Sequence, residues 1–93
     1  MLKIIQPTPE NPENAIWAWW DRARNNVRGA QDKIIDATMD IAESRSAFLD
    51  DSRYYVWRTI VARIVPVAVS GGMDPSLYID LIDAFLGIRK AAT

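Results

Sequence analysis

Large apolar residues recur every seven positions along the first half of the chain. They lie at Trp20, Val27, Ile34, Ile41 and Phe48, and Ile16 extends the stripe backwards. Small residues recur with the same period at Ala23, Ala30, Ala37 and Ser44. A heptad with large residues at one seam position and small ones at the other is typical of a long helix that packs closely against another helix.

The helix that this heptad predicts covers residues 12–49, with Gly29 as its weak point. Asn11, Pro12 and Glu13 form a good helix start: a capping side chain, a proline whose missing N–H costs nothing, and an acid near the positive end of the dipole. The heptad keeps one register on both sides of Gly29, which favours one unbroken helix. The alternative is that Arg28 and Gly29 end a first helix and Asp32 begins a second.

The length of this helix bears on whether the protein has partners. An unbroken helix over 12–49 would be about 57 Å long, whereas a compact domain of this size is about 30 Å across. The rest of the chain could then cover only part of the seam, and the remainder would contact another copy or a different protein. If Gly29 breaks the helix, the same segments form a compact four-helix monomer that requires no partner.

The second half of the chain predicts two further helices. Asp50, Asp51 and Ser52 supply a turn and a cap for a helix over 52–69, which is apolar around most of its circumference and whose last turn Pro66 should kink or shorten. Residues 70–73 form a linker, and Asp74 with Pro75 begins a helix over 75–90. We expect Asp80 and Asp83 to face outward on that helix. We expect its inward face to comprise Leu77, Tyr78, Leu81, Ile82, Phe85 and Ile88.

These elements predict an all-α fold: a long N-terminal helix, either continuous or broken at Gly29, packed with two shorter helices as a helical hairpin or bundle. Residues 12–93 form a single helical domain. Residues 1–11 precede it as an extended arm, because three prolines at 7, 9 and 12 favour extended backbone.

The composition argues against catalysis and against metal binding. The chain has 93 residues, no cysteine, no histidine and a net charge of −1. It therefore lacks the usual ligand of zinc, copper and iron and the commonest general base, and we expect no metal, no cofactor, no small-molecule substrate and no enzymatic activity. Its apolar segments are too short or too charged for a signal peptide or a membrane span, so we expect a cytoplasmic protein, or one enclosed in a virion or other assembly, that is not secreted.

Three tryptophans, Trp17, Trp19 and Trp20, lie within one turn of the first helix and cannot all face one core. At least one indole should lie at the surface, where tryptophan is enriched among binding hot spots. The residues predicted to bind a protein partner are therefore Trp17, Trp19, Trp20, Val27, Ile34 and Ile41. The alternative is that the arm or the last helix of the same chain covers the indoles.

Charges are segregated along the chain, with basic residues gathered in 22–33, acidic residues in 36–51, and further arginines in 53–63. Basic and acidic segments could pair between helices beside a seam. Alternatively, nucleic acid could bind Arg22, Arg24, Arg28, Arg53, Arg58 and Arg63 together with exposed aromatic rings. The near-neutral net charge favours pairing. Asp36, Asp40 and Glu43 share a helix face, which we interpret as solvated because no histidine completes a metal site.

The sequence thus predicts a small non-enzymatic interaction or assembly protein. It would associate through the heptad-patterned helix with itself, as a homo-oligomer, or with a larger protein, as a structural subunit, adaptor or inhibitor. Chains of this kind, without a chemical site, suit phage or mobile-element accessory proteins. The alternative is a nucleic-acid-binding module that uses the arginines.

Overall fold

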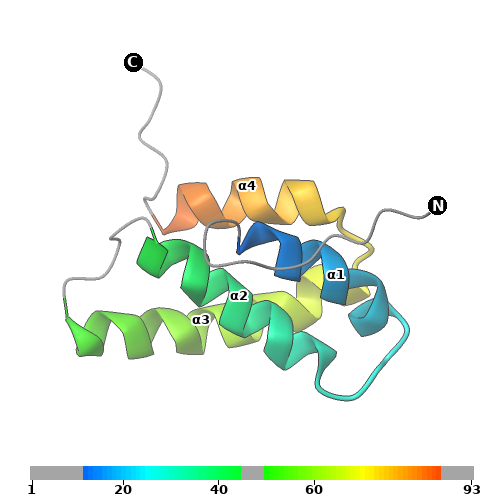
Figure 1. The fold of residues 1–93 in the computed structure, drawn as a ribbon, viewed down its shortest axis with the longest axis horizontal. Helices are drawn as coiled ribbons and strands as arrows, with labels where there is room; N and C mark the ends of the chain where they lie inside the picture. Colours follow the sequence, from blue (N-terminus) through cyan, green and yellow to red (C-terminus); the bar gives the residue numbers. More distant parts are fainter. Residues whose placement is uncertain (1–11, 45–49, 87–93) are drawn as a thin grey trace.

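The computed structural model describes residues 12–44 and 50–86, and over these ranges the chain forms helices and no strands (Figure 1). The helices are α1 (Glu13–Arg24), α2 (Ala30–Ser44), α3 (Asp51–Ser70) and α4 (Pro75–Phe85). The all-α prediction is confirmed. No helix in these two ranges has the length and apolar character needed to cross a bilayer. The predicted arm over 1–11, the seam residue Phe48 and the predicted helical turn over 87–90 lie outside the described residues.

The prediction of one continuous helix over 12–49 is wrong, because the chain reverses direction between Arg24 and Ala30. Asn26 adopts a left-handed conformation with φ 61°. The N–H groups of Asn26 and Val27 then donate to the carbonyls of Ala23 and Arg22 at 3.0 and 2.9 Å, which is the Schellman pattern of a helix end. The alternative of a break is confirmed, although Asn26 and not Gly29 ends the first helix.

Gly29 instead starts the second helix. Its φ is 80°, and its carbonyl accepts the N–H of Lys33 at 3.1 Å. This left-handed conformation is one that glycine adopts without the steric cost of a Cβ. The break shortens the molecule, which measures 39 × 28 × 26 Å, so the predicted rod of about 57 Å does not form.

The heptad keeps its register across the break because α1 and α2 pack mainly on each other. Seam residues of both helices enter one core, where the small alanines let the two backbones approach closely. The seam residues buried there are Ile16, Trp20, Ala23, Ala30, Ile34, Ala37 and Ile41. The repeat therefore records packing within the chain.

The starts of α3 and α4 match the sequence prediction. The Asp50 carboxylate accepts the N–H of Arg53 at 2.9 Å, and the Asp74 carboxylate accepts the N–H of Ser76 at 2.8 Å. These bonds lower the pKa of both carboxyls below the usual value. The helix predicted over 52–69 forms as α3, and Pro66 lies inside α3 without ending it.

A buried polar chain holds α4 against α1 and α2. Trp20 donates its indole N–H to the carbonyl of Met73 at 2.8 Å, and its ring lies 5.0 Å from the ring of Tyr78. The Tyr78 hydroxyl lies 2.8 Å from Oγ1 of Thr38, which donates to the carbonyl of Ile34 at 2.8 Å. Since Thr38 uses its proton on Ile34, Tyr78 donates to Thr38. Burial raises the pKa of Tyr78 to about 12.

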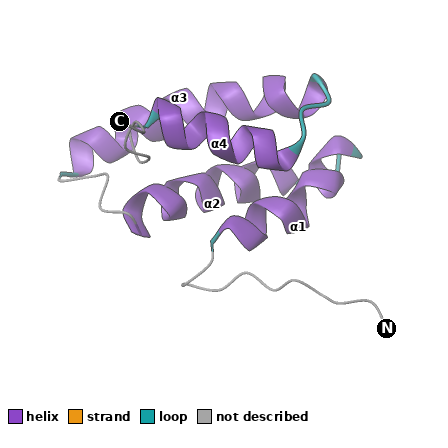
Figure 2. Ribbon diagram, turned by 90° about the horizontal axis from the view of Figure 1, so that it is seen from above, coloured by secondary structure: helices purple, strands orange, loops and turns teal. Residues whose placement is uncertain are grey.

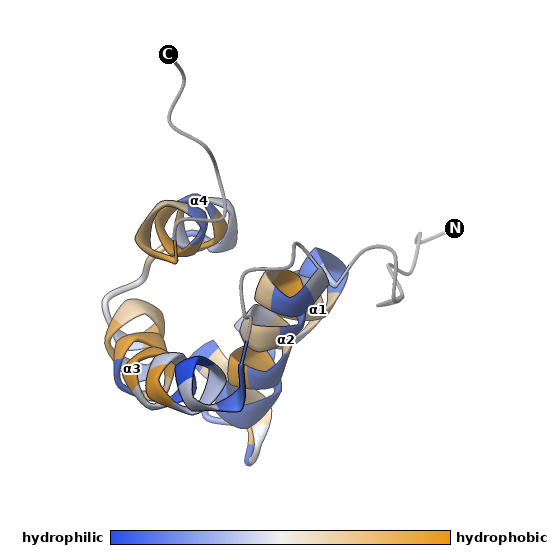
Figure 3. Cartoon of the chain, turned by 90° about the vertical axis from the view of Figure 1, so that its left-hand side faces the viewer, coloured by the Kyte–Doolittle hydropathy of each residue, from blue (hydrophilic) through white to orange (hydrophobic). Residues whose placement is uncertain are grey.

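Figure 3 shows α4 above α3 on one side of the molecule, with α1 and α2 on the other side, and Figure 2 shows the same helices from above. The two helices run in opposite directions and are joined by residues 71–74. The backbone of α4 approaches α1 and α2 more closely than it approaches α3. The contact between α3 and α4 is therefore made by side chains, such as Trp57 and Phe85, and not by close approach of the two backbones.

Candidate interaction surface

The heptad seam is not a free surface in this structure. Trp20, Ile34 and Ile41, three of the predicted partner-binding residues, are at most 1% exposed and belong to the core of their own chain. Val27 lies in the turn between α1 and α2 and is 46% exposed, apart from the rest of the seam. The buried seam residues are therefore used for folding, and contact with a partner must involve other side chains.

The three clustered tryptophans point to different environments. Trp20 is buried, whereas Trp17 is 44% exposed, so at least one indole lies at the surface as expected. Trp19 is partly buried beneath cations of its own chain: the Arg22 guanidinium lies 4.6 Å and the Lys33 ammonium 6.0 Å from its ring centroid. Trp17 is thus the tryptophan of this cluster that remains available for contact.

The predicted orientation of α4 is partly wrong. Leu77, Leu81 and Phe85, which were expected to face inward, are exposed, and Asp83, which was expected to face outward, is buried. The reason is that α4 has apolar residues around much of its circumference, and the core can cover only one side. Tyr78 faces the core through its contacts with Trp20 and Thr38. Leu77, which precedes it and is about 100° away around the helix, therefore faces away from the core.

A second apolar row lies on α3. Val56 and Val67 are exposed, and Ile60 and Ile64, which are partly buried, share a helix face with them through spacings of four, four and three. Trp57 flanks this row and meets Phe85 of α4 edge to face, with ring centroids 5.1 Å apart. The rows of the two helices therefore join.

We call this surface the α3–α4 face. It consists of Val56, Trp57, Ile60, Ile64, Val67, Leu77, Leu81 and Phe85. The exposed fractions of its five most accessible residues range from 45 to 73%. The hydropathy colouring in Figure 3 shows apolar segments on both helices. Together they expose several hundred Å² of apolar surface, which is the range in which patches on small proteins are often functional.

An open hollow of about 320 Å³ extends one end of the α3–α4 face. It is lined by Asp50, Ser52, Arg53, Val56 and Trp57. Two of these residues belong to the face, and the others place a carboxylate, a hydroxyl and a guanidinium around it. An apolar side chain could enter this hollow with polar groups at its edge, which is the usual anatomy of a protein contact.

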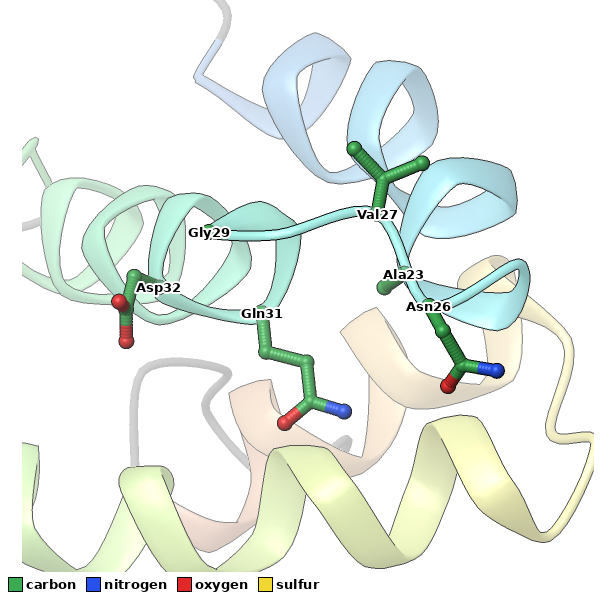
Figure 4. Close-up of a pocket in the computed structure, with 6 residues that line it drawn as sticks. All are labelled: Ala23, Asn26, Val27, Gly29, Gln31 and Asp32. Atoms are coloured by element: carbon green, nitrogen blue, oxygen red, sulfur yellow. The ribbon is translucent and has the colours of Figure 1, made fainter.

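A second hollow of about 300 Å³ lies beside the turn between α1 and α2 (Figure 4). Its lining is Ala23, Asn26, Val27, Gly29, Gln31 and Asp32. The amides of Asn26 and Gln31 point to the same side of the turn. No lining polar side chain is buried, so we assign this hollow no ligand.

The six candidate nucleic-acid arginines do not form one surface. Arg24 contacts the carbonyl of Met73 at 3.4 Å, beyond the end of α3, whereas Arg53 lies in the first turn of α3, about 25 Å away along the helix. Arg58 pairs with Asp36 of α2 at 2.9 Å. Arg22 covers Trp19, and Arg28 and Arg63 are exposed at separate places. Charge pairing between helices, the favoured interpretation, is observed at Arg58.

The acidic row of α2 lies beside this ion pair. Asp36, Asp40 and Glu43 are exposed, and burial followed by the charge of Asp36 raises the pKa of Asp40 above its usual value. Within residues 12–44 and 50–86, no set of three acidic side chains is close enough to hold a metal ion. Asp36, the first residue of this row, is the one that pairs with Arg58 among the ion pairs of the described residues.

The chain matches no protein-family model, no curated protein and no solved structure.

Proposed function

We propose that this protein is a small non-enzymatic interaction module that associates, through the α3–α4 face, with a second copy of itself or with a larger protein. Its role would be that of a structural subunit, adaptor or inhibitor. The observation that carries this proposal is the joining of two apolar rows, one from each helix, at an exposed side of the molecule.

The cost of leaving such a face in water supports the proposal. Each Å² of apolar surface removed from water contributes about 25 cal/mol, so covering several hundred Å² would contribute several kcal/mol to association. The side chains are also of the right kind, since the contact of Trp57 with Phe85 places two large aromatic residues at one end of the α3–α4 face. Nucleic-acid binding gains no comparable support from the described residues, because the arginines are dispersed.

A matched pair of valines tests the proposal. Val67 lies in the α3–α4 face, and Val27 lies outside it, yet both are exposed. In size-exclusion chromatography of extracts from cells that produce the protein, we expect the native chain and Val27→Glu to elute in a complex larger than the 10.5 kDa chain. We expect the double variant Val67→Glu, Leu81→Glu to elute as the free chain. A partner that covers the α3–α4 face would have to bury two unpaired carboxylates, which costs more free energy than the contact supplies.

Circular dichroism and thermal unfolding of each purified variant serve as the folding control, since exposed substitutions should leave the fold intact. The proposal is overturned if the native chain elutes at 10.5 kDa in extracts. It is equally overturned if the folded double variant remains in the complex.

A further inference from the structure

We infer that the N-terminal half of α3, residues 51–60, opens independently of the rest of the fold, losing its helical structure and its contacts with α2 and α4. The ion pair between Arg58 and Asp36 holds this half closed. The α3–α4 face is complete only in the closed state. The inference goes beyond the proposed function, because it concerns the chain alone and its test needs no partner.

The two halves of α3 differ in how deeply they are buried. The second half, residues 61–70, contributes Val61, Val65, Ala68 and Val69 to the core. Within 51–60 no residue is buried, and the best-covered side chains are only half-buried. In Figure 1 the start of α3 extends past the ends of α2 and α4. Segments with few buried contacts open at a lower free energy than the core does, so the first half is the less stable one.

The sequence of the first half does not favour a helix by itself. Six of its ten residues are aromatic or β-branched, namely Tyr54, Tyr55, Val56, Trp57, Thr59 and Ile60, and such residues have low helix propensity. Thr59 also donates its hydroxyl to the carbonyl of Tyr55 at 3.0 Å, a bond that slightly destabilises helices. Because a helix of about ten residues is not stable alone in water, the helix over 51–60 depends on contacts with other elements.

Contacts with α2 and α4 supply this support. Arg58 pairs through Nη2 with Asp36 of α2 at 2.9 Å, and Trp57 meets Phe85 of α4. Both members of the ion pair are partly exposed, so solvent screens their attraction. Nη1 of Arg58 is buried without a hydrogen-bond partner among the described residues, which offsets part of the gain. The closed state of this half is therefore only weakly favoured.

Opening of the first half would remove one end of the α3–α4 face. Val56 and Trp57 belong to the face, and the hollow of about 320 Å³ is lined by residues of this half and by its cap, Asp50. Loss of the contact between Trp57 and Phe85 would also separate the two apolar rows. The ion pair that α3 forms with α2 thus governs the surface that α3 forms with α4, which makes this half a conformational switch.

Hydrogen exchange of the purified chain tests the inference residue by residue. After correction for intrinsic rates, we expect the amides of residues 55–60 to exchange at least about tenfold faster than those of residues 65 and 67–69. In Asp36→Asn, Arg58 loses its ion-pair partner. Exchange at residues 55–60 should then accelerate by a further factor of about two to five, while exchange at 65 and 67–69 stays unchanged.

Asp32→Asn is the matched control, since it removes the same charge from an exposed residue of α2 outside this ion pair, and it should leave the exchange of residues 55–60 at the native rate. The charge-swapped chain, Asp36→Arg with Arg58→Asp, should return exchange at 55–60 towards the native rate.

The inference is overturned if residues 55–60 of the native chain exchange as slowly as residues 65 and 67–69, because α3 then opens as one unit. It is equally overturned if Asp36→Asn accelerates both halves alike or accelerates neither. These outcomes are independent of the chromatography of extracts that tests the proposed function, so either proposal can fail while the other stands.

Discussion

At the scale of single residues, Asn26 and Gly29 decide where the first half of the chain turns. Both have a positive φ, and together they replace what the heptad predicts as helix with a reversal. Asparagine tolerates the left-handed region better than other residues with a Cβ, and glycine adopts it freely. The chain can therefore turn at these two residues without losing the burial of the heptad seam, because α1 and α2 pack against each other after the reversal.

Replacing Gly29 by alanine tests this assignment. A Cβ at Gly29 would meet no atom within 4 Å, so its effect comes from the backbone conformation alone. With φ at 80°, we expect Gly29→Ala to lower the free energy of unfolding by about 1 kcal/mol in urea denaturation. Gly29→Asn should cost less, because asparagine enters this region more readily. A continuous helix would give the opposite result, since alanine would then stabilise the protein.

At the scale of the elements, the docking of α4 depends on the hydroxyl of Tyr78. This group lies inside the protein and donates to Thr38, so the ionised form is disfavoured in the folded chain. The pKa rises from the usual 10.0 to about 12. The free energy of unfolding therefore depends on pH in the range where the Tyr78 hydroxyl ionises.

The sign of this linkage predicts a loss of stability at high pH. Below pH 10 both folded and unfolded chains keep the proton, and the contribution of Tyr78 is fully present. As pH rises from about 10 to about 12, the unfolded chain loses the proton first, and the free energy of unfolding should fall by about 2 kcal/mol. Tyr78→Phe should lose about 1 kcal/mol at pH 7 with its hydrogen bond, and its stability should fall less steeply between pH 10 and 12. Urea denaturation of both proteins across this range measures the difference, and equal slopes would contradict the linkage.

The elements also show which parts of the fold can be predicted from sequence. The starts of α3 and α4 depend on Asp50 and Asp74, whose caps are local and therefore visible in the sequence. The all-α class and the close packing at the alanine positions also follow from spacing alone. The helix that faces the seam cannot be identified from spacing, because a heptad has the same pattern whether the facing helix belongs to the same chain or to another.

The candidate site was missed for a related reason. Leu77, Leu81 and Phe85 have the spacing of a buried row, and so do Tyr78 and Ile82. Which row faces the core is decided by the contacts of Tyr78 with Trp20 and Thr38, which lie far away in sequence. The one available signal was that α4 carries more apolar residues than a single buried stripe requires.

At the scale of the whole molecule, folding and the proposed association both depend on the same limited set of apolar side chains. A chain of 93 residues buries a small core, and here α1, α2 and one side of α4 use most of it. The apolar rows that remain exposed on α3 and α4 contribute little to the stability of the monomer. They would contribute more if a partner covered them and removed them from water. Association would therefore add stability that the isolated chain lacks.

This coupling predicts that thermal stability depends on protein concentration. If the α3–α4 face is covered by a second copy, the melting temperature of the native chain should rise by several degrees over about a hundredfold increase in concentration, because mass action favours the folded dimer. Val67→Glu should melt at one temperature throughout, equal to that of the native chain at the lowest concentration, since Val67 is 73% exposed in the monomer. Val27→Glu should keep the concentration dependence. Differential scanning fluorimetry of all three proteins makes the comparison, and a native melting temperature that does not change with concentration would show that the face stays uncovered when the chain is alone.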